Sequence, residues 1–129
     1  MSSRTNIAQD LGIVQSLHPA ARTNATHNGT GVDLAGYEGA LVKFDVGAVT
    51  DGTHAPKIQE SDDNSTYTDV AAADLSGALA NLASNTPQKQ GYIGRKRYIR
   101  AVITTTGATT GAIAGATVVR GAPHQTPAA

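Results

Sequence analysis

The chain has 129 residues, no cysteine, and a formal net charge of zero from ten basic and ten acidic residues. The length indicates one domain, and the lack of cysteine excludes disulfides and thiolate metal sites. The balanced charge argues against nucleic-acid binding, which depends on a cationic face. Only 4% of the residues are aromatic and Trp is absent, so we expect a thin core of Val, Ile, Leu and Ala. Such a core leaves room for stabilisation by assembly.

The chain shows no run of about eighteen apolar residues that would span a membrane. Its first residues lead into no hydrophobic segment, so we predict no secretory signal and a protein made in a cytoplasm. Residues 1–10 are polar and aperiodic and are expected to form a flexible N-terminal arm. Residues 11–121 form the predicted domain, and residues 122–129 a polar C-terminal tail.

Residues 11–17 predict the first strand, with Leu11, Ile13 and Leu17 on one face. The pair His18-Pro19 is expected to end or bend it. The next stretch, rich in Thr, Asn and Ala, is either an exposed strand or a long loop, and a short strand is expected at 32–34.

The clearest alternation comes next along the chain. Val42, Phe44 and Val46 fall on one side of a strand, while Lys43 and Asp45 fall on the other. This period of two is typical of a half-buried strand, and we expect the single Phe to anchor the core.

A β-hairpin is predicted at 57–70 because two extended runs flank the turn-forming residues 61–65. Its tip carries Asp62 and Asp63, whose oxygens are of the type that binds calcium. Their spacing does not match the twelve-residue calcium loop. A solvated acidic turn without metal is therefore the expectation.

Residues 71–84 leave two interpretations open. Leu75, Leu79 and Leu82 have helical spacing, and Asp74 is a possible helix cap. Gly77 interrupts that pattern, so the segment is either a short helix or an irregular connection.

Further strands are predicted at 88–93, 98–105 and 112–119, the second with Ile99, Ala101 and Ile103 on one face. About eight strands then follow one another at roughly ten-residue spacing with short turns. This pattern predicts an all-β fold: an antiparallel β-sandwich of jelly-roll or immunoglobulin-like type.

No reactive constellation is evident in the sequence. Neither a nucleophile elbow nor a phosphate-binding glycine motif is present, so we expect no enzyme activity and no cofactor. The histidines lack metal-binding spacing and are expected on surface loops; they are His18, His27, His54 and His124.

One basic cluster stands out as a candidate interface. It comprises Arg95, Lys96, Arg97 and Arg100, together with Tyr98. It is either a solvated turn or an electrostatic contact to an acidic partner or a neighbouring subunit. Tyr and Arg are enriched where interfaces take their binding energy.

Three segments, QESDD at 59–63, YTDV at 67–70 and GYIGRKRYIR at 91–100, carry a family resemblance. With them the chain, over about residues 10–122, resembles small virion proteins of tailed bacteriophages, among them capsid decoration (cement) proteins. The resemblance implies a homotrimeric β-sandwich on the outer capsid surface, bound to the major capsid protein. The expected function is structural: stabilising contacts between capsomers.

The alternative is a tail or head-fibre domain that binds cell-surface glycan, because similar hairpins occur in phage tail and adhesin-like β-domains. Sugar sites usually stack aromatic rings, and this chain has four Tyr, one Phe and no Trp. That shortage favours the structural interpretation.

Overall fold

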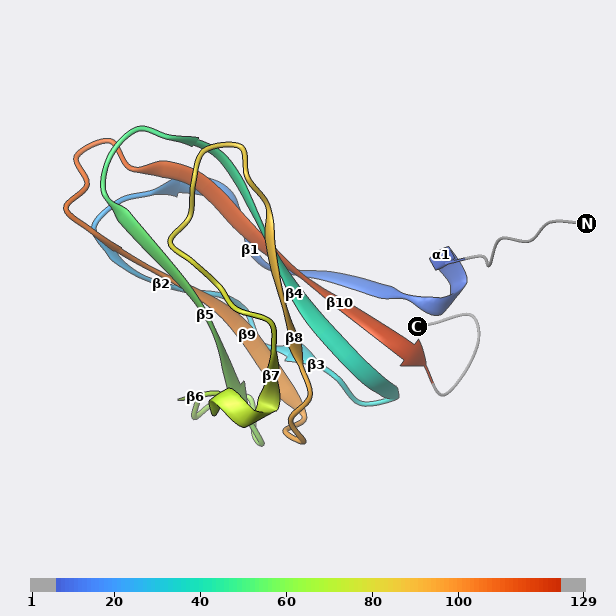
Figure 1. The fold of residues 1–129 in the computed structure, drawn as a ribbon. Helices are drawn as coiled ribbons and strands as arrows, with labels where there is room; N and C mark the ends of the chain where they lie inside the picture. Colours follow the sequence, from blue (N-terminus) through green and yellow to red (C-terminus); the bar gives the residue numbers. More distant parts are fainter. Residues whose placement is uncertain (1–6, 124–129) are drawn as a thin grey trace, which may run out of the picture.

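The computed structural model describes residues 7–123, which form a two-layer all-β structure (Figure 1). In chain order its elements are α1 (Ile7–Asp10), β1 (Gly12–Arg22), β2 (Ala25–Asn28), β3 (Val32–Asp33), β4 (Tyr37–Val49), β5 (Thr53–Ser61), β6 (Thr68–Asp69), the 3-10 turn η1 (Ala72–Asp74), β7 (Leu75–Ser76), β8 (Gln88–Tyr92), β9 (Tyr98–Thr106) and β10 (Ala112–Pro123).

The strands form two antiparallel sheets, which confirms the predicted sandwich. Sheet A has the order β1-β10-β4-β8-β7, and sheet B has the order β2-β9-β5-β6. The short strand β3 also pairs with β9, along the edge that β2 occupies. The described chain therefore has ten strands, where about eight were expected.

The two additional strands, β3 and β7, are short. Without them the strand order is that of a jelly roll. Because β2 and β3 share one edge of β9, they fill a single position, while β7 adds only two residues beyond β8. Of the eight remaining positions, the first, eighth, third and sixth form one sheet. The second, seventh, fourth and fifth form the other, which is the double Greek-key order of a jelly roll. An immunoglobulin sandwich instead pairs its first strand with its second.

The core lies between the sheets, where the predicted alternation places it. Val42 and Phe44 of β4 are fully buried, as are Ile99 and Ile103 of β9. The rest of the core is mostly aliphatic and includes alanines of both sheets, as the composition predicts: Leu17, Val32, Ile58, Val70, Leu82, Tyr92, Ala101, Ala114, Ala116 and Val118.

The first strand differs from its prediction because β-bulges interrupt it. The strand continues through His18-Pro19, and its register against β10 shifts between Gln15 and Leu17 and again before Ala20. A bulge reverses the faces on which later side chains lie, so Leu17 is buried while Ile13 is 67% exposed. Proline is tolerated here because β1 is an edge strand.

The segment after the hairpin is irregular, and no α-helix forms in it. A 3-10 turn leads into the two-residue strand β7, and Gly77 then takes a left-handed φ of +92°, which turns the chain. The leucines nevertheless lie toward the core: Leu82 is buried, and Leu75 and Leu79 pack against the core cluster. The spacing of these leucines therefore reflects the burial of an irregular segment and not one face of a helix.

Candidate interaction site

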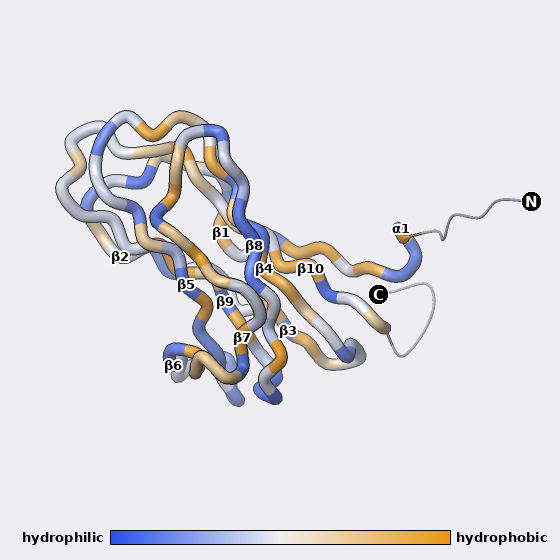
Figure 2. Tube along the Cα trace, in the orientation of Figure 1, coloured by the Kyte–Doolittle hydropathy of each residue, from blue (hydrophilic) through white to orange (hydrophobic). Residues whose placement is uncertain are grey.

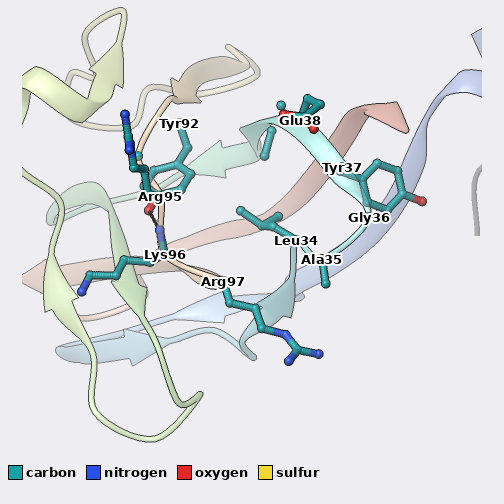
Figure 3. Close-up of a pocket in the computed structure, with 12 residues that line it drawn as sticks. Leu34, Ala35, Gly36, Tyr37, Glu38, Tyr92, Arg95, Lys96 and Arg97 are labelled. Carbon is teal, nitrogen blue, oxygen red and sulfur yellow. Dashed lines mark hydrogen bonds between the residues drawn. The ribbon is translucent and has the colours of Figure 1, made fainter. Parts of the chain in front are cut away.

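Three loops lie together at one end of the sandwich, the lower end in Figure 1. They are the hairpin tip at 61–67, the β8–β9 turn at 93–97 and the β3–β4 loop at 34–36. Strand β8 pairs with β4 only as far as Ala40 opposite Tyr92, and then the Ile93 amide donates to the Asp74 carbonyl instead. The departure of β8 leaves a groove of about 380 Å³, lined by residues 34–40, Tyr92 and residues 94–97. We call it the loop-end groove (Figure 3).

The hairpin tip is closed on itself by hydrogen bonds. The Asp63 carboxylate accepts the backbone N–H groups of Ser65 and Thr66, both at 2.9 Å, and the Ser61 hydroxyl at 2.8 Å. These bonds favour the charged carboxylate and lower the pKa of Asp63 to about 2. Asn64 takes a left-handed φ of 60° at the turn. The hairpin prediction is confirmed, with Gln59 opposite Asp69.

Two of the predicted interface cations form ion pairs with neighbouring loops. Lys96 Nζ lies 2.7 Å from Asp62 of the hairpin tip. Arg97 donates two hydrogen bonds to Asp33, at 3.0 and 2.8 Å. Both bonded carboxylates raise the pKa of the cation they meet, and Arg97 lowers the pKa of Asp33. The β8–β9 turn is thus joined to the hairpin on one side and to the β3–β4 loop on the other.

Tyr98 and Arg100 are the members of the cluster that belong to strand β9, and both lie on the outer face of sheet B. Arg100 donates to the Gln59 side-chain oxygen at 3.0 and 2.7 Å, and its guanidinium lies 4.1 Å from the centre of the Tyr67 ring. Tyr98 is half-buried, with Arg97 stacked 5.2 Å from its ring centre. Cation–π contacts of this kind hold both partners in place.

Arg95 is exposed and, unlike the exposed Arg97, pairs with no carboxylate of the described residues. Within residues 7–123 its side chain has no hydrogen bond or ion pair. Figure 3 shows it beside Tyr92 on one wall of the loop-end groove, with Glu38 and Leu34 across from it. Of the five predicted interface residues, Arg95 is therefore the one whose charge is available to a partner.

Tyr92 is the residue at the centre of this end that the sequence did not single out. Its hydroxyl donates to Glu60 at 2.8 Å and accepts the Lys96 backbone N–H at 3.0 Å. Burial is the main cause that raises the pKa of Tyr92, with the Glu60 bond second, so the hydroxyl remains a donor at neutral pH. Its two partners come from β5 and from the β8–β9 turn, and no local sequence signal joins them.

At the opposite end, His54 contradicts the expectation of surface histidines. It is 1% exposed in β5, with Nδ1 2.8 Å from Thr105 Oγ1 and Nε2 2.9 Å from the Asp51 carbonyl oxygen. His18 and His27 are more exposed, but both lie in strands rather than loops, and His124 lies outside the described residues.

The Asp51 carboxylate ties two loops of this end together. It accepts backbone N–H groups from Thr109, Thr110 and Gly111, the last at 2.7 Å. These bonds lower the pKa of Asp51. The β4–β5 and β9–β10 connections are thereby joined through one side chain.

Within residues 7–123, no three His, Asp or Glu side chains group in a way that would hold a metal ion. None of the helices in that range is long and apolar enough to cross a membrane. Comparison with known proteins returns no matching family model, no matching curated protein and no matching solved structure.

Proposed function

We propose that this chain is a non-enzymatic structural protein of a tailed-phage particle. It binds the outer capsid surface through the major capsid protein, as a homotrimer, and stabilises contacts between neighbouring capsomers. The sequence resemblance given above supplies the phage context and the trimeric state. The jelly-roll order adds an analogy, because that architecture recurs in viral capsid domains, although a fold alone does not define a function.

The observation that carries the proposal is the loop end, where ion pairs join neighbouring loops. Its charged side chains are used mainly to hold loops to one another: Lys96 to Asp62 and Arg97 to Asp33. The result is a preformed surface that displays Arg95 at the groove. Preformed surfaces lose little conformational freedom on binding, which suits a protein that attaches in many copies to a repeating lattice.

The glycan-binding alternative is less well supported by the aromatic residues. Three tyrosine rings each have an arginine over one face: Arg97 on Tyr98, Arg100 on Tyr67 and Arg120 on Tyr37. The remaining aromatic rings, Tyr92 and Phe44, are buried. Each arginine thus occupies a ring face on which a sugar could otherwise stack.

The test is localisation in intact particles of the parent phage by electron microscopy, combined with the heat resistance of those particles. We expect the protein on the outer head surface, and heads that lack it should fail at a lower temperature, because a ligand of the intact state stabilises that state. Equal heat resistance with and without the protein, together with a position on the tail, would replace the proposal by the adhesin alternative.

A further inference from the structure

A row of apolar side chains crosses the outer face of sheet A. Ile13 of β1 pairs with Val119 of β10, which pairs with Leu41 of β4. Directly paired residues point to the same face. Since Val42 and Val118, their neighbours along the strands, point into the core, this row points away from it. Ile13 is 67% exposed, and the other two side chains are half-exposed.

The adjacent row continues this surface, with Leu11 at one end and a hollow at the other. Leu11 lies over Gly121, with its Cδ2 3.3 Å from the position that a Cβ on Gly121 would take. Gly121 pairs with Gly39, above which no atom of the described residues lies within 4 Å of a Cβ position. We call the whole surface the apolar face: Leu11, Ile13, Gly39, Leu41, Val119 and Gly121. None of its residues is charged.

Nothing within a single copy of the chain requires a glycine at position 39. It lies inside β4, its φ is not in the left-handed region, and a side chain would meet open space. Glycine weakens a strand, and in a strand it often marks the close approach of another backbone. Because no such approach occurs within the described chain, the hollow at Gly39 points to contact with another molecule.

The edge beside the apolar face is also unprotected. Natural edge strands are usually blunted by proline, charge or bulges. The second half of β1 has Pro19 and two bulges, but residues 12–15 pair regularly with β10 and carry neither. Of the five large hydrophobic side chains exposed within residues 7–123, three lie here and in α1: Ile7, Ile13 and Val14. Figure 2 shows hydrophobic stretches along β1 and β10 where they run toward α1.

We propose that a second copy of this chain packs on the apolar face. The six residues of the face carry no charge, so the face meets its own copy without repulsion between them. The protruding Ile13 and the hollow at Gly39 lie on one face with β10 between them, about 12 Å apart. The protrusion of one copy enters the hollow of the next in a two-fold pair or a closed three-fold ring. The inference rests on the self-association contained in the proposed function and names the surface that performs it.

The test uses the full-length protein and two substitutions that leave the core untouched. Gly39→Val fills the hollow, and Ile13→Lys places a charge on the protrusion. We measure mass by sedimentation equilibrium over a wide concentration range, and Tm by circular dichroism. Both variants should raise the dissociation constant of the assembly at least about tenfold, which corresponds to about 1.4 kcal/mol. Monomeric Gly39→Val should melt no lower than the wild-type monomer, because valine favours strands.

Ile93→Lys is the matched control, since Ile93 is 64% exposed but lies on the β8–β9 turn; it should associate like the wild type. The cysteine-free chain allows a second test, the double variant Ile13→Cys with Gly39→Cys. The two sites are about 12 Å apart within one copy, too far for a disulfide, so an oxidised product of two or three chains supports the proposal.

Two results would overturn the inference. If the wild type self-associates and both variants associate as tightly, copies meet through another face, while the proposed function stands. If the wild type is a monomer throughout, and its capsid binding is lost in Ile13→Lys, the face belongs to the capsid protein. A wild type that associates through this face yet binds no capsid would instead contradict the proposed function alone.

Discussion

The buried hydrogen bond between His54 of β5 and Thr105 of β9 allows a quantitative test of how these two strands are held together. The Asp51 carbonyl can only accept a hydrogen bond, so His54 Nε2, 2.9 Å away, must carry a proton. In the neutral ring Nδ1 then accepts the Thr105 hydroxyl, 2.8 Å away. Both side chains are almost completely buried, so water cannot replace the bond between them.

The magnitudes follow from which polar groups each substitution leaves without a partner. Thr105→Val keeps the side-chain shape but leaves Nδ1 without a donor, at a cost of about 1–3 kcal/mol. His54→Leu leaves the Thr105 hydroxyl and the Asp51 carbonyl unpaired. We expect it to cost about 2–4 kcal/mol, since the apolar surface of leucine recovers part of the loss. The double variant leaves only the carbonyl unpaired and should be less destabilised than the sum of both by about 1–2 kcal/mol.

The assay is urea unfolding at pH 7 followed by circular dichroism. Thr104→Val is the control, because Thr104 lies on the opposite face of β9 and is half-exposed; it should change the unfolding free energy by no more than about 0.5 kcal/mol. If the losses at His54 and Thr105 add to within about 0.5 kcal/mol, the two side chains do not depend on each other and the reasoning fails.

Three further predictions concern the charged loop end. Asp63→Asn should lower Tm at pH 7 more than Asp62→Asn does, and this difference should vanish near pH 2. The reason is that the Asp63 carboxylate, whose pKa is depressed in the folded protein, stabilises the fold at a pH above its pKa in the unfolded chain. That stabilisation is lost as the pH falls through about 2. Millimolar calcium or EDTA should shift Tm by no more than about a degree, a shift of several degrees revealing an ion site. Arg95→Ser should weaken capsid binding without changing Tm, whereas Lys57→Ser, on sheet B with Asp69 as its partner, should leave binding unchanged.

The sequence predicted the parts of the fold that depend on local patterns. Alternation around Val42 and Phe44, and again at Ile99 and Ile103, correctly identified the strands that face the core, because each of these strands keeps its register through its buried part. The turn residues at 61–65 correctly identified the hairpin. Both signals lie within a few residues of the structure that they specify.

The parts that the sequence did not predict depend on contacts distant along the chain. Arg97 meets Asp33 across 64 positions, and His54 meets Thr105 across 51, so neither pair leaves a local pattern. The face of Ile13 was unpredictable for a different reason. A single extra residue in a strand moves every later side chain to the other face. No sequence pattern around Gln15 predicts the position of the bulge.

The two surfaces described here imply different physics for attachment to a lattice. At the loop end most cationic side chains are already paired, and the whole chain is electrically neutral, so long-range attraction contributes little. Binding should then depend only weakly on salt and more on how many copies act together. If copies join through the apolar face, each assembly presents two or three Arg95 side chains at fixed spacing. A second contact made within an assembly is intramolecular, so weak single contacts combine into strong attachment. Ile13→Lys should therefore lower capsid affinity even though Ile13 itself does not touch the capsid, and joining two copies of that variant by a flexible linker should restore part of the affinity.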